Sequence, residues 1–207
     1  MRDRLLESYE ARGELLNQLA KNLTEETLGV LGDQPHVDRV SYRVKGAKSF
    51  IEKARDPANN PAYAEPLVEI EDQVAGRVLV FFLSDIAPVL ARLGGAFTLV
   101  ESSRRRPAKD DEFGYESHHL ICMIPPQTKP GGWSDLDSPP RTFELQVRTL
   151  FMHAWAEPQH DLEYKAAEDL PRIIQRELYW IAASSWGADQ AFERIVEWQR
   201  QRSGGKQ

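Results

Sequence analysis

The sequence predicts an α+β fold in which helices flank a mixed β-sheet. Apolar residues near the N-terminus recur at helical spacing, strand-like runs alternate with helical segments through the middle of the chain, and the pattern is helical again over 171–200. These patterns follow the two periods of regular structure, 3.6 residues for a helix and two for a strand. Their order indicates helices packed on the faces of one mixed sheet.

Residues 3–31 form the first predicted helical region, with leucines on one face and Gly13 as a weak point. Residues 37–45 are strand-like and lead into a short helix over 47–55. The segment that begins Asp56-Pro-Ala-Asn-Asn-Pro breaks the chain, because Pro and Asn favour turns.

The middle of the chain supplies the central strands. Residues 78–83 are a continuous apolar run, which is typical of a strand buried on both faces. Asp85 caps a helix that ends near Gly94-Gly95. There follow a strand over 96–101, a loop over 102–113 with Arg104, Arg105, Arg106 and Lys109, a strand over 118–124, and a connection over 125–140 rich in Pro, Gly, Ser and Asp.

Residues 143–165 are predicted to form a strand that runs into a helix. In the strand, Phe143, Leu145 and Val147 alternate with Glu144, Gln146 and Arg148. Successive side chains of a strand point to opposite faces, so one face is core and the other is polar. The polar face is either an ordinary half-exposed surface or a site of chemistry, and the rest of the chain decides between them.

Two C-terminal helices are predicted, over 171–186 and 188–200, with 203–207 frayed. They carry Trp180, Trp186 and Trp198, for which the core is the expected place, although presentation to another subunit stays open. The chain is expected to form a single domain over 1–207, with a core at about 37–166, N-terminal helices over 3–31 and C-terminal helices over 171–200.

Composition narrows the class of protein. Of the 207 residues, 41% are hydrophobic and 28% charged, and no apolar run approaches the roughly 20 residues that cross a bilayer. The N-terminus has no apolar signal region, and the single cysteine, Cys122, has no partner for an intramolecular disulfide. A cytoplasmic location without membrane contact is therefore expected. The net charge of −6 argues against general nucleic-acid binding.

Asp72 and Glu144 are candidate ligands of one Mg²⁺ ion. Asp72 lies where the chain enters a central strand, and Glu144 lies on the polar face of another. Mg²⁺ selects hard oxygen ligands and usually completes its shell with waters and substrate phosphates. Taken alone, Asp72 is better explained as a helix or turn cap, and Glu144 as an ion-pair partner of Arg148 or of a neighbouring lysine.

Two further groups suit a nucleotide. Arg43, Lys45, Ser49 and Lys53 cluster at a strand-to-helix junction, and Ser49 and Lys53 share a helix face, so together they form a credible triphosphate clamp. The alternative is a solvated basic face. Tyr115 follows Gly114 at the mouth of a strand, where its ring is a platform for a nucleobase. The alternative is a turn glycine beside a half-buried tyrosine.

Other arrangements are rejected. Glu157 and His160 are one helical turn apart, as in helical metal centres, but matching carboxylates are missing and Pro158 should disturb the helix. The single His160-Asp161 pair gives little support to a metal phosphohydrolase. Cys122 lies in an apolar strand and is expected in the core rather than as a nucleophile.

Taken together, the motifs resemble the synthetase domain of the RelA/SpoT family, specifically the small stand-alone alarmone synthetases. The resemblance runs from about Val40 to Lys165. It rests on Arg43-x-Lys45-x-x-x-Ser49-x-x-x-Lys53, Asp72-x-x-x-Gly76-Arg77, Gly114-Tyr115-x-Ser117-x-His119, and Glu144-x-Gln146-x-Arg148-Thr149 followed by His153-Ala-Trp-Ala-Glu157 and His160 to Tyr164-Lys165. Each motif is weak alone, and the ordered set is specific.

The resemblance implies a nucleotidyltransferase-like sheet and transfer of pyrophosphate from ATP to the 3′-hydroxyl of GDP or GTP, with AMP released. It implies that Asp72 and Glu144 hold Mg²⁺ and that Glu144 orients or deprotonates the attacking hydroxyl. Phosphoryl chemistry of this kind depends mainly on positioning and on neutralising charge. The implied binding residues are Arg43 and Arg77 around the adenine, Lys45, Ser49 and Lys53 on the ATP phosphates, and Tyr115, His119, Gln146 and Arg148 on the acceptor.

The chain departs from the family pattern in the acceptor-binding loop. Many guanosine-specific members carry Asp-Tyr-Ile and Pro-Lys there, whereas Arg104-Arg105-Arg106-Pro-Ala-Lys109 precedes Gly114 in this chain. Such cations suit nucleotide phosphates or an RNA backbone, since contacts to phosphate are indifferent to sequence. A toxic activity on the 3′ end of tRNA or on adenosine nucleotides therefore stays an alternative. No hydrolase domain is recognisable, and homo-oligomer formation and a neutralising antitoxin stay open.

Overall fold

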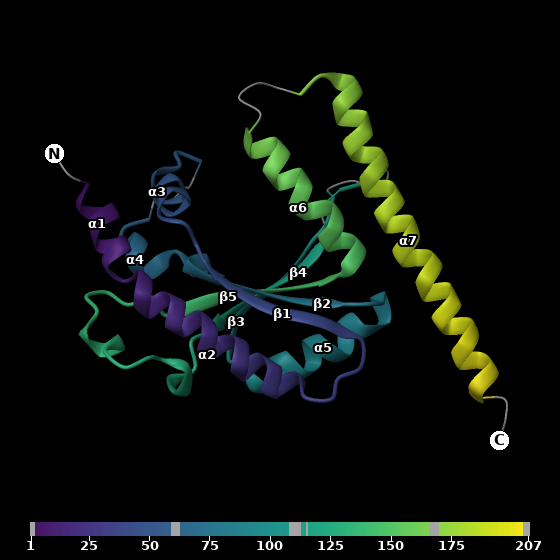
Figure 1. The fold of residues 1–207 in the computed structure, drawn as a ribbon, viewed down its shortest axis with the longest axis horizontal. Coiled ribbons are helices and arrows are strands. Elements are labelled where there is room, and N and C mark those ends of the chain that lie inside the picture. The colour runs from purple at the N-terminus through teal and green to yellow at the C-terminus, as the bar shows by residue number, and fades with distance from the viewer. Residues whose placement is uncertain (1–2, 59–62, 108–112, 115, 166–169, 205–207) are drawn as a thin grey trace.

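The computed structural model describes residues 3–58, 63–107, 113–114, 116–165 and 170–204, and for 159–161 and 163–165 it describes the backbone alone. Within these ranges the chain forms a sheet of five strands in the order β1-β2-β5-β4-β3 (Figure 1). β2 and β5 are parallel and the other neighbours antiparallel, so the predicted mixed sheet is confirmed. The strands are β1 (Val37–Val44), β2 (Val74–Val80), β3 (Leu99–Arg105), β4 (Ser117–Met123) and β5 (Thr142–Thr149).

One face of the sheet is covered by α2 (Gly13–Leu31) and α5 (Leu83–Ala96), which lie below it in Figure 1. Leu16, Leu19 and Leu23 of α2 are fully buried, as are Val78 of β2 and Leu145 of β5. Burying aliphatic side chains of this size contributes about 1.5–3 kcal/mol each. This layer is the main core of the domain, and it leaves the opposite face of the sheet available for polar side chains.

The opposite face is bordered by helices at its two ends. α1 (Arg4–Ala11) and α3 (Ala47–Arg55) lie at one end, joined by the stacked rings of Tyr9 and Phe50 at 3.9 Å. α6 (Leu150–Lys165) and α7 (Arg172–Gly204) lie at the other. Short turns complete the described chain: α4 (Pro66–Glu69) and 3-10 turns at 71–73, 126–128 and 133–135.

Several predicted strand boundaries are wrong by a few residues. β2 begins at Val74 rather than 78, because Ala75 and Arg77 alternate with core residues before the fully apolar stretch begins. β3 extends to Arg105, so Arg104 and Arg105 belong to a strand instead of a loop. β3 is an edge strand with mostly exposed side chains, so its sequence lacks the apolar signal of a central strand.

The C-terminal helices are also corrected: 172–204 form one helix, without a break at Gly187. A glycine inside a helix costs only about 1 kcal/mol relative to alanine, which tertiary context overrides. α7 packs on α6 and α5 with one side only. Its Trp180 is 67% exposed, and Trp186 and Trp198 are about half exposed, so the expectation that these rings lie in the core is wrong. Pro158, expected to disturb a helix, lies inside α6.

Among the described helices, none is both long and apolar enough to cross a membrane. Cys122 is buried in β4, as expected, and burial raises the pKa of its thiol to about 12. A thiol held protonated in this way is a core residue and a poor nucleophile.

Candidate active site

The register of the strands places the polar side chains on one face. In antiparallel and parallel neighbours alike, paired residues share a face. Glu144 pairs with Ala75 and Ile121, and Gln146 with Arg77 and His119. Arg43 pairs with Ala75. We call this side of the sheet, opposite to Leu145 and Val147, the site face.

A cavity of about 640 Å³ lies on the site face between the sheet, α3 and α6. It brings together every predicted site residue that the structure describes: Arg43, Lys45, Ser49, Lys53, Asp72, Arg77, His119, Glu144, Gln146 and Arg148. Tyr115, the predicted platform for the acceptor base, lies outside the described residues. The cavity volume is typical of small-molecule sites.

Asp72 lies in the 3-10 turn before β2, between two lysines. Its Oδ2 accepts from Lys45 Nζ at 2.8 Å and its Oδ1 from Lys53 Nζ at 3.0 Å. Burial alone would raise the pKa of Asp72, but the two ammonium groups outweigh it and hold the pKa below its usual value. Asp72 is therefore charged at neutral pH and keeps both lysines over the cavity.

Glu144 lies near the middle of β5 and is only 8% exposed. Its Oε1 is 2.5 Å from His119 Nδ1, and its Oε2 accepts from Gln146 Nε2 at 3.0 Å. Burial raises the pKa of Glu144 and the charge of Asp72 adds to this, but the contacts with His119 and Gln146 prevail and lower it. The result is a charged, oriented carboxylate beside Asp72.

The pair of carboxylates fits a Mg²⁺ ion that also binds substrate phosphates. Asp72 and Glu144 are close enough for their charges to interact and they line the same cavity. Among the described residues, no cluster of three or more His, Cys, Asp or Glu side chains could hold a metal by itself. Mg²⁺ commonly binds through one or two carboxylates and takes its other ligands from waters and phosphates.

The basic residues of the predicted phosphate clamp converge from two elements. Lys45 follows β1, and its backbone N–H donates to Gln73 O at 2.9 Å, which ties it to the turn that carries Asp72. Ser49 and Lys53 lie on the following helix, α3, and reach the same cavity. Strand-to-helix geometry thus brings together the residues that the sequence placed at one junction.

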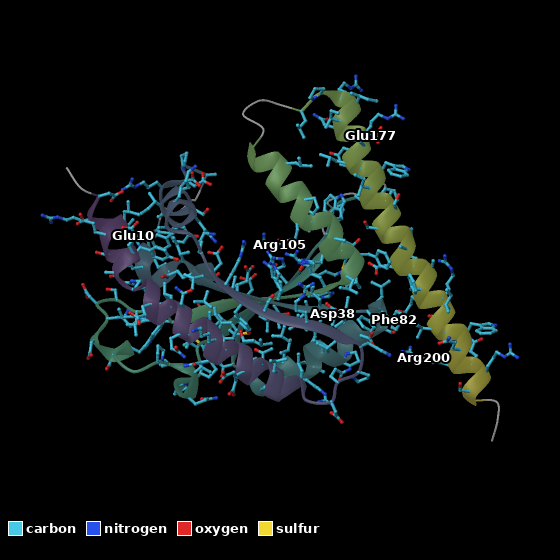
Figure 2. All side chains as sticks on the ribbon, viewed as in Figure 1. Glu10, Asp38, Phe82, Arg105, Glu177 and Arg200 are labelled. Carbon is cyan, nitrogen blue, oxygen red and sulfur yellow. The ribbon has the colours of Figure 1, made fainter. Side chains whose placement is uncertain are left out.

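The three consecutive arginines Arg104, Arg105 and Arg106 do not line the same cavity. Arg105 lines the active-site cavity and lies in the space between the sheet and α6 (Figure 2). Arg104 pairs with His118 across the strands, on the opposite face from His119, and its Nη2 is 3.0 Å from Glu116 Oε2. Arg104 and Arg106 line a different cavity. Alternation along β3 explains why neighbouring arginines have different surroundings.

Glu157 is the site residue that sequence reasoning missed. The sequence placed it in the family motif that begins at His153 and weighed it as a metal ligand with His160, but assigned it no role in the site; the side chain of His160 lies outside the part of the chain that the structure describes. In the structure Glu157 lines the active-site cavity, and its Oε1 is 2.8 Å from Arg77 Nη1. The spacing from His153, one helical turn earlier, was the available signal, since it places both side chains on one face of α6.

Comparison with known proteins identifies the family of this chain. The model for the region found in RelA/SpoT proteins matches residues 42–169. GTP pyrophosphokinase YjbM of Bacillus subtilis is 33% identical over 168 residues, which cover 79% of this chain and 74% of YjbM. GTP pyrophosphokinase YwaC of the same organism is 27% identical over 161 residues, with 75% and 71% covered.

Solved structures show the same fold. The small alarmone synthetase 1 of Bacillus subtilis superposes with a TM-score of 0.77 at 25% identity, covering 93% of this chain and 98% of that one. Its complex with the product pppGpp gives a TM-score of 0.74, also at 25% identity, covering 91% and 96%. This chain therefore belongs to the RelA/SpoT family and has the α+β fold of the small alarmone synthetases.

Proposed function

We propose that this protein is a pyrophosphokinase that transfers the β,γ-diphosphate of ATP to the 3′-hydroxyl of GDP or GTP and so makes (p)ppGpp. The observation that carries the proposal is the shared cavity, in which two charged carboxylates face the basic residues of β1 and α3. The relatives named GTP pyrophosphokinase and the neighbour solved with pppGpp support the same acceptor class.

The ATP side is formed by β1, α3 and β2. Lys45, Ser49 and Lys53 bind the phosphates, and Arg43 and Arg77 enclose the adenine between their planar guanidinium groups. In the structure the two lysines bind Asp72, so nucleotide phosphates would compete with that carboxylate for the same ammonium groups.

Asp72 and Glu144 would hold Mg²⁺ together with the phosphates of ATP. When bound, the ion neutralises negative charge on the phosphates that rearrange in the reaction. The two carboxylates supply the hard oxygen atoms that Mg²⁺ prefers, and both have lowered pKa values, so protons do not compete for them at neutral pH.

Glu144 accepts the proton of the attacking 3′-hydroxyl. A bond forms between the 3′-oxygen and the β-phosphorus, the bond from that phosphorus to the α,β-bridging oxygen breaks, and AMP leaves with the electron pair. His119 and Gln146 hold the Glu144 carboxylate in place through its two oxygens. Positioning of the acceptor by His119, Gln146 and Arg148 lowers the entropic part of the barrier.

The alternative acceptors, a tRNA 3′ end or an adenosine nucleotide, are not favoured. The hypothesis of such an acceptor rested on the cluster of Arg104, Arg105 and Arg106. Of these three residues, only Arg105 lines the active-site cavity. Arg104 is paired with Glu116 on the other side of the sheet. The proposal therefore keeps a nucleotide acceptor, with Tyr115 stacked on its base as the family resemblance implies.

Self-association is a separate part of the proposal. The exposed apolar residues of α7, among them Ile173, Trp180 and Trp198, form a face that water solvates poorly. A homo-oligomer would cover that face, and light scattering on the purified chain measures its size. A neutralising antitoxin and a cytoplasmic location remain expectations.

The direct test follows β,γ-labelled Mg-ATP in parallel reactions with GDP, GTP, ADP and deacylated tRNA. The expected products are labelled guanosine alarmone and AMP in a one-to-one ratio. Asp72→Asn and Glu144→Gln should each lower turnover by at least about a hundredfold while the circular dichroism spectrum is unchanged. Label only in tRNA, or full activity in either variant, contradicts the proposal.

A further inference from the structure

A second cavity, of about 520 Å³, lies at the edge of the sheet where β5 leads into α6. α5, α6 and α7 form its walls, and the start of β4 forms its floor. Arg104 of β3, and Arg106 and Gly114 between β3 and β4, line it, but none of the described residues proposed above to contact ATP, the acceptor or the metal does. Its volume is in the range of about 300–1,000 Å³ that is usual for small-molecule sites.

Aromatic and aliphatic side chains make up much of the lining. Trp155 is buried and its indole N–H donates to Leu178 O at 3.2 Å, which fixes the ring. Trp186 packs edge-on against Phe113, with ring centroids 5.6 Å apart. Leu83 and Ile86 of α5 line the facing wall. Walls of this kind favour a flat ring, since stacking on aromatic side chains is worth about 1–3 kcal/mol for a nucleobase.

Asp189 places a buried acceptor in this apolar lining. It is 2% exposed, and its Oδ2 accepts from Thr149 Oγ1 at 2.7 Å. Its Oδ1 is buried and has no hydrogen-bond partner among the residues the structure describes. An unpaired buried polar atom costs about 1–3 kcal/mol, so an occupant that offers an N–H to Oδ1 gains this amount on binding.

We propose that the cavity is a second binding site, which takes an amino-bearing purine nucleoside with its base between the aromatic walls and an N–H of the base donated to Asp189 Oδ1. Arg104, which is paired with Glu116, and Arg106 also line the cavity, so cations are present for a 5′-phosphate. The ligand class follows from three properties of the lining: flat apolar walls, one unpaired acceptor and nearby cations.

The site is connected to the active site through hydrogen bonds. Thr149, which donates to Asp189, also accepts from the backbone N–H of Met152 at 3.1 Å and so caps the first turn of α6. Thr149 directly follows Arg148, and α6 carries Glu157 on the side of the active site. A base bound to Asp189 is thus linked to the helix that borders the catalytic cavity.

Binding is tested by calorimetry of guanosine and adenosine with the full chain, without ATP or Mg²⁺. Neutral nucleosides are chosen because they lack the phosphates that Lys45, Ser49 and Lys53 of the catalytic cavity are proposed to bind. Purine riboside, which has neither the amino group nor a ring N–H, should bind about tenfold more weakly. Because no turnover is measured, the result does not depend on the proposed pyrophosphokinase activity.

Three variants locate the site. Asp189→Asn keeps the size of the side chain, and Trp186→Ala removes a half-exposed ring; each should weaken nucleoside binding about tenfold or more. Trp180→Ala on the same helix does not line the cavity and should bind as the unchanged protein does. Circular dichroism confirms that each variant is folded.

Four outcomes would overturn the inference. They are no binding at millimolar nucleoside, equal binding of purine riboside, unchanged binding in both Asp189→Asn and Trp186→Ala, and complete displacement by a non-hydrolysable ATP analogue. The last two would place the nucleoside in the catalytic cavity instead. Retention of binding in Arg77→Ala, which removes one of the two guanidinium groups proposed to enclose the adenine in the catalytic cavity, is expected if the second cavity is the site.

Discussion

Arg77 of β2 is paired with Glu157 of α6 across the active-site cavity, with Nη1 and Oε1 2.8 Å apart. The same Glu157 oxygen is 3.8 Å from Arg148 Nη1 and 3.9 Å from His153 Nδ1. One carboxylate thus faces a residue proposed to bind ATP, a residue proposed to bind the acceptor and a histidine of its own helix. Glu157 therefore ties Arg77 and Arg148 to α6.

Glu157→Gln should raise the KM for ATP about two- to fivefold and leave kcat within about twofold. The reason is that Arg77 loses its charged partner, and a half-exposed ion pair of this kind is worth about 1 kcal/mol or less. Steady-state kinetics at varied ATP and saturating GDP measure the two parameters separately. Glu177→Gln, exposed on α7, is the control. A fall in kcat with unchanged KM would instead make Glu157 a participant in the chemical step.

Gly76→Ala should lower the free energy of unfolding by at least about 1 kcal/mol, because it adds a methyl group to a filled core. A Cβ at this position would lie 2.4 Å from Tyr42 Cε1 and 2.8 Å from Leu145 Cδ1. Urea denaturation measures the change. The matched control is Gly187→Ala, where nothing lies within 4 Å of the added Cβ. That variant should gain up to about 1 kcal/mol from helix propensity, and an equal loss in both would argue against the packing explanation.

The sequence was sufficient to predict the site face because apolar and polar residues alternate along β5, although burial itself does not. Glu144, Gln146 and Arg148 had to share a face once Leu145 and Val147 entered the core, and the junction of β1 and α3 held the clamp together in sequence. The position of Glu157 depends on how α6 crosses β2, which no local pattern encodes. For Arg104 and Arg105, the pairing of β3 with β4 decides which one faces the site.

The length and exposure of α7 were unpredictable for a related reason. Gly187 is a weak stop signal, and only the surroundings of the helix decide whether it ends there. Trp180 and Trp198 have large apolar rings, but whether such a ring is buried depends on which side of α7 packs against α5 and α6. Residue type predicts burial only on average, and it does not identify exposed apolar surfaces such as this side of α7.

Asp72→Asn should cost about 1 kcal/mol of unfolding free energy at pH 7, besides abolishing turnover. The pKa of Asp72 is lower in the folded protein than in the unfolded chain, so its charge stabilises the fold above the unfolded pKa of about 3.9. That contribution disappears as pH falls through the folded pKa. Urea denaturation of both proteins at pH 7 and pH 3 should show the difference shrinking in acid. Asp33→Asn, almost fully exposed, should show little difference at either pH.

Asp189→Asn should have the opposite pH dependence. Burial raises the pKa of Asp189 from 3.8 to about 6, and Glu116 and Glu193 add to the effect, while the hydrogen bond from Thr149 opposes it. The cavity is also lined by Arg104, Arg106 and Glu116 and by His118, whose pKa is lowered by burial and by Arg104. A raised pKa means that the folded state holds a proton that the unfolded chain has lost between about pH 4 and 6, so stability falls as pH rises through this window.

The size of the effect is about 2–3 kcal/mol between pH 4 and pH 7, if the charged form has no ligand to pair with it. Asp189→Asn cannot ionise and keeps a side chain able to bond Thr149, so it should be more stable than the unchanged protein at pH 7 and nearly equal to it at pH 4. Melting temperatures across this range test the sign. A nucleoside that donates to Asp189 Oδ1 should reduce the difference at pH 7, because it stabilises the charged carboxylate that the variant lacks. The opposite result would be a stability difference between variant and unchanged protein that moves against the variant as pH rises from 4 to 7. That result would show that Asp189 is already paired when charged.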